Sequence, residues 1–212
     1  MRVGQLVPNL GFHDAIAREA RAIDRLLRMA GHAAALFAGR AHPRAAAGWR
    51  PLAEYRPGDW DAVILHHSTD SGGADLLAGT RGILLYHNIT PPQYFYGINP
   101  ELVAAGARGL AQLAVLLPAA AAVWADSAFN LGELRARGLR GGRVVPYLLD
   151  ATDTASCPLP WGKAGEEGAS APGAPQGRSA GCVGAEPLLL MVGRVVPNKG
   201  HDFALRALAE LA

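Results

Sequence analysis

The residues with the most evident chemistry are two cations and two glycines in residues 193–202, which read GRVVPNKGHD. Arg194 and Lys199 stand on a turn that also bears Gly193 and Gly200, after an apolar run and before an amphipathic helical pattern. Backbone N–H groups and fixed cations at such a strand-to-helix turn are suited to bind a diphosphate. An ordinary turn with two solvated cations has the same spacing. A Walker A loop is excluded, because that motif needs Ser or Thr after its Gly-Lys pair, and here His201 follows Lys199 and Gly200.

Other residues that could do chemistry lie near short apolar runs. For His66 and His67, no nearby Asp, Glu or Cys completes a metal coordination set, so we expect ordinary loop histidines. His87 follows an apolar run, and a hydrogen-bonded core histidine and a ligand-binding histidine fit this position equally. The Asp-Trp-Asp of residues 59–61 precedes its strand, which predicts a turn or a strand-entry role and not a metal site. The aromatic residues 94–96 suit either stacking on a ligand or a packed loop.

Short, continuous apolar runs alternate with longer segments of helical period. Continuous apolar strands are typical of a parallel sheet that is buried on both faces. We therefore predict an α/β fold with a doubly wound, mainly parallel, Rossmann-like sheet, whose ligands bind beyond the carboxyl ends of the strands. The predicted strands are residues 3–7, 33–38, 62–66, 82–86, 121–125 and 143–147, and the predicted helices are residues 13–30, 100–117 and 128–137.

Composition narrows the partners and the compartment. Half of the residues are hydrophobic, and the net charge is +2 with dispersed basic residues, which predicts a soluble protein that does not bind nucleic acid. The N-terminus lacks the pattern of a signal peptide, and no uncharged apolar run is long enough to span a bilayer. We expect a cytoplasmic protein with reduced Cys157 and Cys182, a disulfide between them being the alternative.

A change of composition divides the chain into three parts. Residues 151–186 are rich in Gly, Ala, Pro and Ser and lack apolar periodicity, which predicts a disordered linker or insertion. Residues 1–150 form the large α/β domain. Residues 187–212 supply one strand and one helix of an incomplete second Rossmann-like domain, which is too little to bury a core alone.

Four segments resemble those of family 4 glycosyltransferases, which have the two-domain GT-B fold, and they stand along the chain in the order that the family has. The GRVVPNKGHD segment resembles their donor-binding turn. The other three are HDAI at residues 13–16, LYHNITPP at residues 85–92, and ADSAFN at residues 125–130 followed by VPY at residues 145–147. The resemblance covers about residues 1–150 and 187–212. It implies an acceptor-side N-terminal domain and the first strand and helix of a nucleotide-sugar-binding domain, with the family's acidic motif beyond them.

The resemblance also implies an activity. A sugar would pass, with retention of its anomeric configuration, from a nucleotide diphosphate sugar to a glycan, lipid or small-molecule acceptor, with neither a metal nor another cofactor. Arg194 and Lys199 would neutralise the leaving diphosphate, and His87 would line the sugar pocket. A lipid acceptor would bring contact with the inner face of the membrane. The residues implied to contact the substrates are Gly11, Asp14, Asn88, Ser127, Asn130 and Gly193.

Two alternatives stay open. One is another GT-B enzyme, such as a nucleotide-sugar epimerase. The other is an inactive fragment or acceptor-binding module. We expect the 212-residue chain by itself to bind nucleotide sugar weakly and to transfer none, because one strand and one helix cannot form a donor pocket.

Overall fold

The structure is a computed structural model, and it describes residues 1–12, 14–45, 47–148 and 199–211. The chain divides into two units, Met1–Ala151 and Thr152–Ala212, each of which is considered by itself. The described part of the second unit is Lys199, Gly200 and the helix α5 (His201–Leu211). The predicted linker, both cysteines, Gly193 and Arg194 lie outside the described residues.

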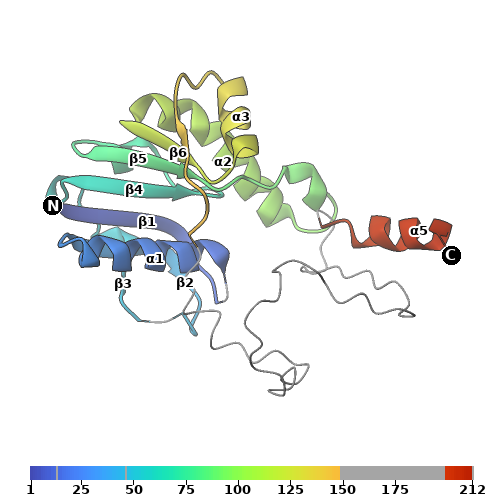
Figure 1. The fold of residues 1–212 in the computed structure, drawn as a ribbon, viewed down its shortest axis with the longest axis horizontal. Helices are drawn as coiled ribbons and strands as arrows, with labels where there is room; N and C mark the ends of the chain where they lie inside the picture. Colours follow the sequence, from blue (N-terminus) through green and yellow to red (C-terminus); the bar gives the residue numbers. More distant parts are fainter. Residues whose placement is uncertain (13, 46, 149–198, 212) are drawn as a thin grey trace, which may run out of the picture. The chain divides into compact units, whose positions relative to one another are not determined.

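The first unit is an α/β Rossmann-like fold built on one seven-stranded, all-parallel sheet (Figure 1), which confirms the predicted fold class. The order of the strands is β3-β2-β1-β4-β5-β6-β7, so the direction of winding reverses between β1 and β4. In such sheets ligands bind at this reversal, beyond the carboxyl ends of the strands. The strands are β1 (Arg2–Leu10), β2 (Ala33–Ala41), β3 (Trp49–Pro51), β4 (Ala62–His67), β5 (Arg81–Tyr86), β6 (Ala122–Ala125) and β7 (Arg143–Val144).

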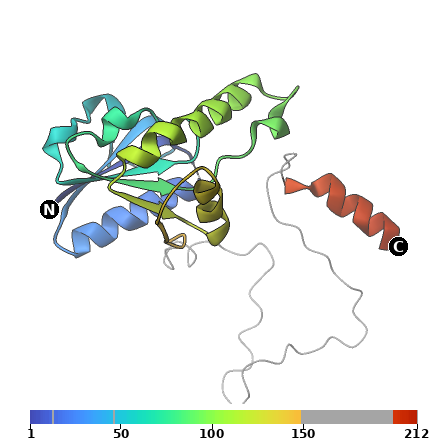
Figure 2. The ribbon, with the colours of Figure 1, turned by 90° about the horizontal axis from the view of Figure 1, so that it is seen from above.

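Three helices follow strands of this sheet, and each begins at a side-chain cap. The oxygens of Asp14, Asn99 and Ser127 accept hydrogen bonds from the backbone N–H three residues further on, which satisfies a donor that the first helical turn leaves free. Figure 2 shows α1 and α2 on opposite faces of the sheet. The helices are α1 (Ala15–Met29), α2 (Pro100–Ala119) and α3 (Ala128–Ala136), and short 3₁₀ turns are η1 (Leu52–Glu54), η2 (Pro57–Asp59), η3 (Ala74–Leu77) and η4 (Pro92–Phe95).

The edges of the sheet differ most from the prediction. The predicted strand at residues 3–7 continues through Pro8 to Leu10, since beyond Leu6 the strand β1 pairs with β2 alone and a missing N–H costs no bond there. The short edge strand β3 was not predicted, because its three residues do not form an apolar run. At the other edge, β7 keeps two of the five residues predicted for it.

Residues alternate between the two faces along each strand, so the sheet has two distinct core layers. One layer packs under α2 and α3 and includes Leu6, Leu65, Leu84, Val123, Leu113, Leu116 and Leu134. The other packs under α1 and includes Val3, Ile64 and Leu85, with Ile23 and Leu27 of the helix against them. Gln5, His66 and His87 stand at the same alternation as this second layer, so polar groups follow apolar ones toward the carboxyl end.

The helix α2 lies unusually close to the loop after β4. A Cβ atom on Gly109 would be 2.7 Å from the backbone carbonyl carbon of Thr69 and 2.9 Å from Cδ1 of Ile89. By length and composition alone, α2 is also long and apolar enough to cross a membrane, a test that the core helix of a soluble protein passes as well. Here Leu113 and Leu116 of this helix are buried in the core of the first unit.

Replacement of Gly109 by alanine should destabilise the first unit. The added methyl group would meet backbone atoms, which cannot turn aside as a flexible side chain can. Overpacking of this kind costs about 1–3 kcal/mol of the free energy of unfolding. Chemical denaturation followed by circular dichroism would measure the change.

Gly132→Ala is the matched control, because a Cβ atom on Gly132 of α3 would have no heavy atom within 4 Å. This variant should gain up to about 1 kcal/mol from the higher helix propensity of alanine. If Gly109→Ala were as stable as Gly132→Ala, the close packing of α2 would be wrong.

Candidate functional site

The two adjacent histidines of β4 are core residues, and their interpretation as loop histidines is wrong. His66 and His67 end β4, are fully buried and face opposite sides of the sheet. On the α2 side, Nδ1 of His67 lies 2.5 Å from the Ser71 hydroxyl oxygen. Nε2–H of His67 donates to the Gly109 carbonyl oxygen at 2.9 Å. Burial within strands explains why both rings find partners far away in sequence.

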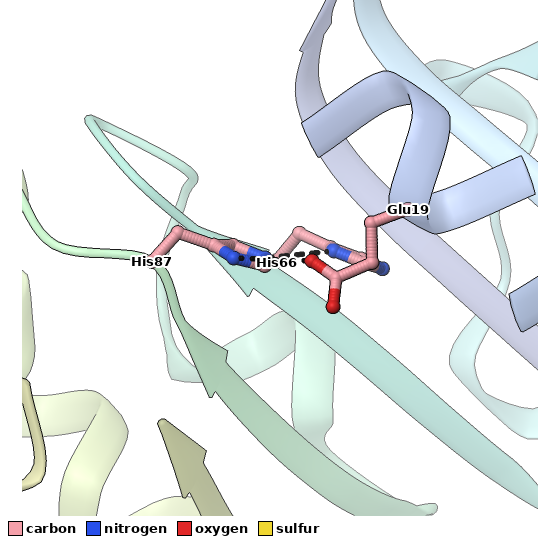
Figure 3. A group of neighbouring side chains, drawn as sticks. All are labelled: Glu19, His66 and His87. Carbon is pink, nitrogen blue, oxygen red and sulfur yellow. Dashed lines mark hydrogen bonds and ion pairs between the residues drawn. The ribbon is translucent and has the colours of Figure 1, made fainter. Parts of the chain in front are cut away.

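His66 belongs to a buried polar chain under α1. Nε2 of His66 lies 3.0 Å from Oε1 of Gln5, and the Gln5 amide nitrogen donates to the Ala20 carbonyl oxygen at 2.9 Å. Nδ1 of His66 lies 3.0 Å from Nε2 of His87, and the two rings are stacked with their planes 10° apart. Figure 3 shows Glu19 reaching from α1 toward these two imidazoles.

Two carboxylates face the other nitrogen of His87. Its Nδ1 lies 3.4 Å from Oε2 of Glu19 and 3.6 Å from Oδ2 of Asp126. Glu19 is fully buried, and its other oxygen accepts from the Leu148 N–H at 3.3 Å. Among the described residues, neither Glu19 Oε2 nor His87 Nδ1 has a hydrogen-bond partner, and their contact at 3.4 Å is an ion-pair distance. These two atoms therefore depend on each other.

Burial shifts the pKa values of the titratable groups at this site. Loss of solvation raises the pKa of Glu19, against an opposing effect of the neighbouring His87. Loss of solvation, with the charge of His87 as the next cause, holds the pKa of His66 well below its ordinary value. Burial also lowers the pKa of His67. At neutral pH both strand histidines are therefore neutral.

A row of polar side chains continues from this chain to the carboxyl edge of the sheet. Asn130 donates to Oδ1 of Asp126 and accepts from the Asn88 amide at 3.2 Å, which joins the segments that follow β5 and β6. Asn88 has a φ of 69°, a left-handed conformation that asparagine tolerates better than most residues. Strained backbone of this kind is often found at functional sites. We call Asn88, Asp126 and Asn130, with Ser127, the edge row.

The structure brings four of the predicted site residues together, namely His87, Asn88, Ser127 and Asn130. The His87 side chain is only 2% exposed and both ring nitrogens face protein groups, so the surface that His87 offers to a ligand is its backbone. The Ser127 hydroxyl is engaged as the N-cap of α3, where it accepts from the Asn130 N–H at 3.1 Å. Asn130 is itself buried.

The remaining predicted residues lie elsewhere. Asp14 caps α1, and its carboxylate accepts from the Ala17 N–H at 3.1 Å. Gly11 packs against it, since a Cβ atom there would be 2.7 Å from that of Asp14. Lys199 is exposed and precedes Gly200, whose φ of 67° ends the turn before α5. Gly193 and Arg194 are outside the described residues.

Sequence reasoning missed Gln5, Glu19, His66 and Asp126 as members of this site. A signal for two of them existed, because Gln5 and His66 interrupt otherwise apolar strands, where a polar residue needs a buried partner. Glu19 had no such signal, since a glutamate in an amphipathic helix usually faces solvent. The expected turn or strand entry at residues 59–61 is confirmed, because Asp59 ends the 3₁₀ turn η2 and Asp61 directly precedes β4, where its carboxylate accepts from the Arg2 N–H at 2.7 Å.

Three buried residues, Glu19, His66 and His87, have the side chains of metal ligands. Glu19, His66 and His87 each offer one ligand atom, and these atoms lie within 4.8 Å of one another. His66 and His87 use one ring nitrogen each in the contact between the two imidazoles, whereas Glu19 Oε2 and His87 Nδ1 have no hydrogen-bond partner among the described residues. A cavity of about 340 Å³ adjoins Glu19 under α1, with Ile23, Leu85 and Trp124 in its mainly apolar lining.

No known protein-family model matches this sequence, and no curated protein matches it. Any assignment of a function therefore depends on the geometry described above and on the four segments that resemble family 4 glycosyltransferases.

The free energy of unfolding should fall as the pH falls below about 6.5, the ordinary pKa of histidine. Below that value the unfolded chain takes up protons at His66 and His67, whereas the folded protein, in which both pKa values are lowered, does not. Each group removes up to about 1.4 kcal/mol per pH unit in this window. Urea denaturation at a series of pH values measures the slope, and His66→Gln should reduce it.

Glu19 acts in the opposite sense, because a raised pKa contributes stability that is present below pH 4.5 and is lost as the pH rises through the folded value. An equal slope in wild type and His66→Gln would show that His66 is not buried as a neutral ring.

Proposed function

We propose that this protein is a glycosyltransferase of the retaining GT-B type, similar to family 4, which uses a nucleotide diphosphate sugar as donor. The observation that carries the proposal is the edge row. It gathers amide, carboxylate and hydroxyl groups from two loops at the carboxyl edge of an all-parallel sheet. Ligands of such sheets bind at this edge.

The chemistry of the edge row suits a sugar acceptor. Asp126 is 20% exposed, and its carboxylate can accept a hydrogen bond from a hydroxyl group. The Asn88 amide nitrogen already donates to Asn130, which leaves its oxygen for a further donor. Both side chains are held by neighbours, so little conformational entropy is lost when a ligand binds.

Lys199 and the start of α5 suit the donor diphosphate. The helix begins at His201, directly after the left-handed Gly200, and its first N–H groups form the positive end of the helix dipole. Lys199 is exposed next to them. A cation and a helix N-terminus together would stabilise the negative charge that grows on the leaving diphosphate during transfer.

The variant Lys199→Ala should weaken binding of nucleoside diphosphates and their sugars by about tenfold, the usual effect of one charge-assisted hydrogen bond. Calorimetric titration of the full chain with the diphosphates and sugar conjugates of uridine and guanosine measures the affinity. The uncharged nucleosides should bind no better to wild type than to the variant.

Arg206→Ala is the matched control, because Arg206 is an exposed cation of the same helix two turns from Lys199. Equal affinities of Lys199→Ala and Arg206→Ala would contradict a diphosphate site at this turn. Conversion of a labelled nucleotide sugar into its epimer, in place of transfer to an acceptor, would replace the proposed reaction by isomerisation.

A further inference from the structure

The hydrogen bonds under α1 have only one consistent direction. The Ala20 carbonyl oxygen can only accept, so Gln5 turns its NH₂ group toward it and presents Oε1 to His66. Nε2 of His66 must then carry the hydrogen. Because buried His66 is neutral, its Nδ1 has a lone pair and accepts from Nε2–H of His87.

This direction leaves Nδ1 of His87, the last group in this series of hydrogen bonds, without a hydrogen-bond donor. With Nε2 of His87 as a donor, a neutral His87 would point the lone pair of Nδ1 at Oε2 of Glu19 and Oδ2 of Asp126, 3.4 and 3.6 Å away. If both acids were ionised, three acceptors would face one another without a hydrogen between them. Such an arrangement is costly in a buried site, where like charges and lone pairs are poorly screened.

One additional proton resolves this contact. We propose that Glu19, His87 and Asp126 form a buried proton-binding site that holds a single proton between His87 Nδ1 and the two carboxylates. Either Glu19 is a neutral acid that donates to Nδ1, or His87 is an imidazolium that donates to Glu19. The two descriptions differ only in the position of the hydrogen within one contact.

The surroundings of the site favour retention of this proton. On α1, Glu19 has lost its solvation, which raises its pKa. The other titratable group that faces Glu19 is Tyr147, whose own pKa is raised to about 12 by burial and by the charge of Glu19. His66 of β4, which is neutral, and Asp126, in the segment after β6, are the other titratable neighbours of His87. No lysine or arginine is among the groups that shift the pKa of Glu19 in the described residues.

The bound proton closes a ring of contacts. The ring leaves α1 at the Ala20 carbonyl, passes through Gln5 of β1, His66 of β4 and His87 after β5, and returns to α1 at Glu19. With one proton, the three groups have a net charge of −1. Asp126, the partly exposed member, therefore presents negative charge at the edge row and selects hydroxyl or ammonium donors over anions. This inference does not depend on the proposed glycosyl transfer.

Nitrogen NMR of the histidine rings in the full-length chain tests the proposal. At about pH 8, above the ordinary pKa of histidine, His66 should carry its hydrogen on Nε2, and Nδ1 of His87 should give a protonated or strongly hydrogen-bonded signal. In Glu19→Gln the new amide can donate to Nδ1 and still accept from Leu148, so Nδ1 of His87 should become a hydrogen-bonded lone pair. Glu54→Gln, at an exposed glutamate paired with Arg50, should give the signals of wild type.

Asp126→Asn provides a second measurement if Glu19→Gln does not fold. Loss of this negative charge should make the site release its proton at a lower pH than in wild type. A free lone-pair signal for His87 Nδ1 in wild type at about pH 8, above the ordinary pKa of histidine, or a hydrogen on Nδ1 of His66, would overturn the proposal. Stoichiometric zinc in the purified chain, with His87 signals that change on treatment with a chelator, would replace the proton by a metal ion.

Discussion

The hydrogen bond from Gln5 to the Ala20 carbonyl oxygen is the contact on which the polar interior of this protein depends. It joins the inner strand β1 to the helix α1 that covers it, and a carbonyl oxygen can only accept. The bond therefore orients the amide, the amide orients His66, and His66 orients His87. Three side chains that would each be costly to bury alone are thus joined in one directed series of hydrogen bonds.

The two faces of the sheet use their buried histidines differently. On the α2 side, His67 is bonded to Ser71 and to the backbone of Gly109, where the absent side chain of the glycine permits the close approach. This contact is local to the packing of one helix. On the α1 side, the chain through His66 leads outward to Asp126 and the edge row. Only that face connects the core to the edge where ligands of parallel sheets bind.

Helix caps account for two residues that the family resemblance would assign to substrates. Asp14 and Ser127 each follow a strand and start a helix, and their side-chain oxygens accept from backbone N–H groups. The first turn of a helix needs such acceptors whether or not a ligand is present. Asn88 and Asp126 are likewise half-buried, but they are held by Asn130 rather than by a helix end.

The sequence by itself determined the parallel α/β fold and most of its elements. Apolar runs and helical periodicity depend on residues near one another in the chain, and so do the ends of α1 and α3 at the left-handed Gly31 and Gly138. Tertiary structure decided that residues 49–51 form the strand β3 and that His66 and His67 are buried. Gln5 and His66 are 61 residues apart, and Glu19 meets His87 only because α1 packs across the carboxyl half of the sheet. A buried polar group is defined by its partner, and no local pattern identifies a partner that the folding of distant strands brings within 3–4 Å.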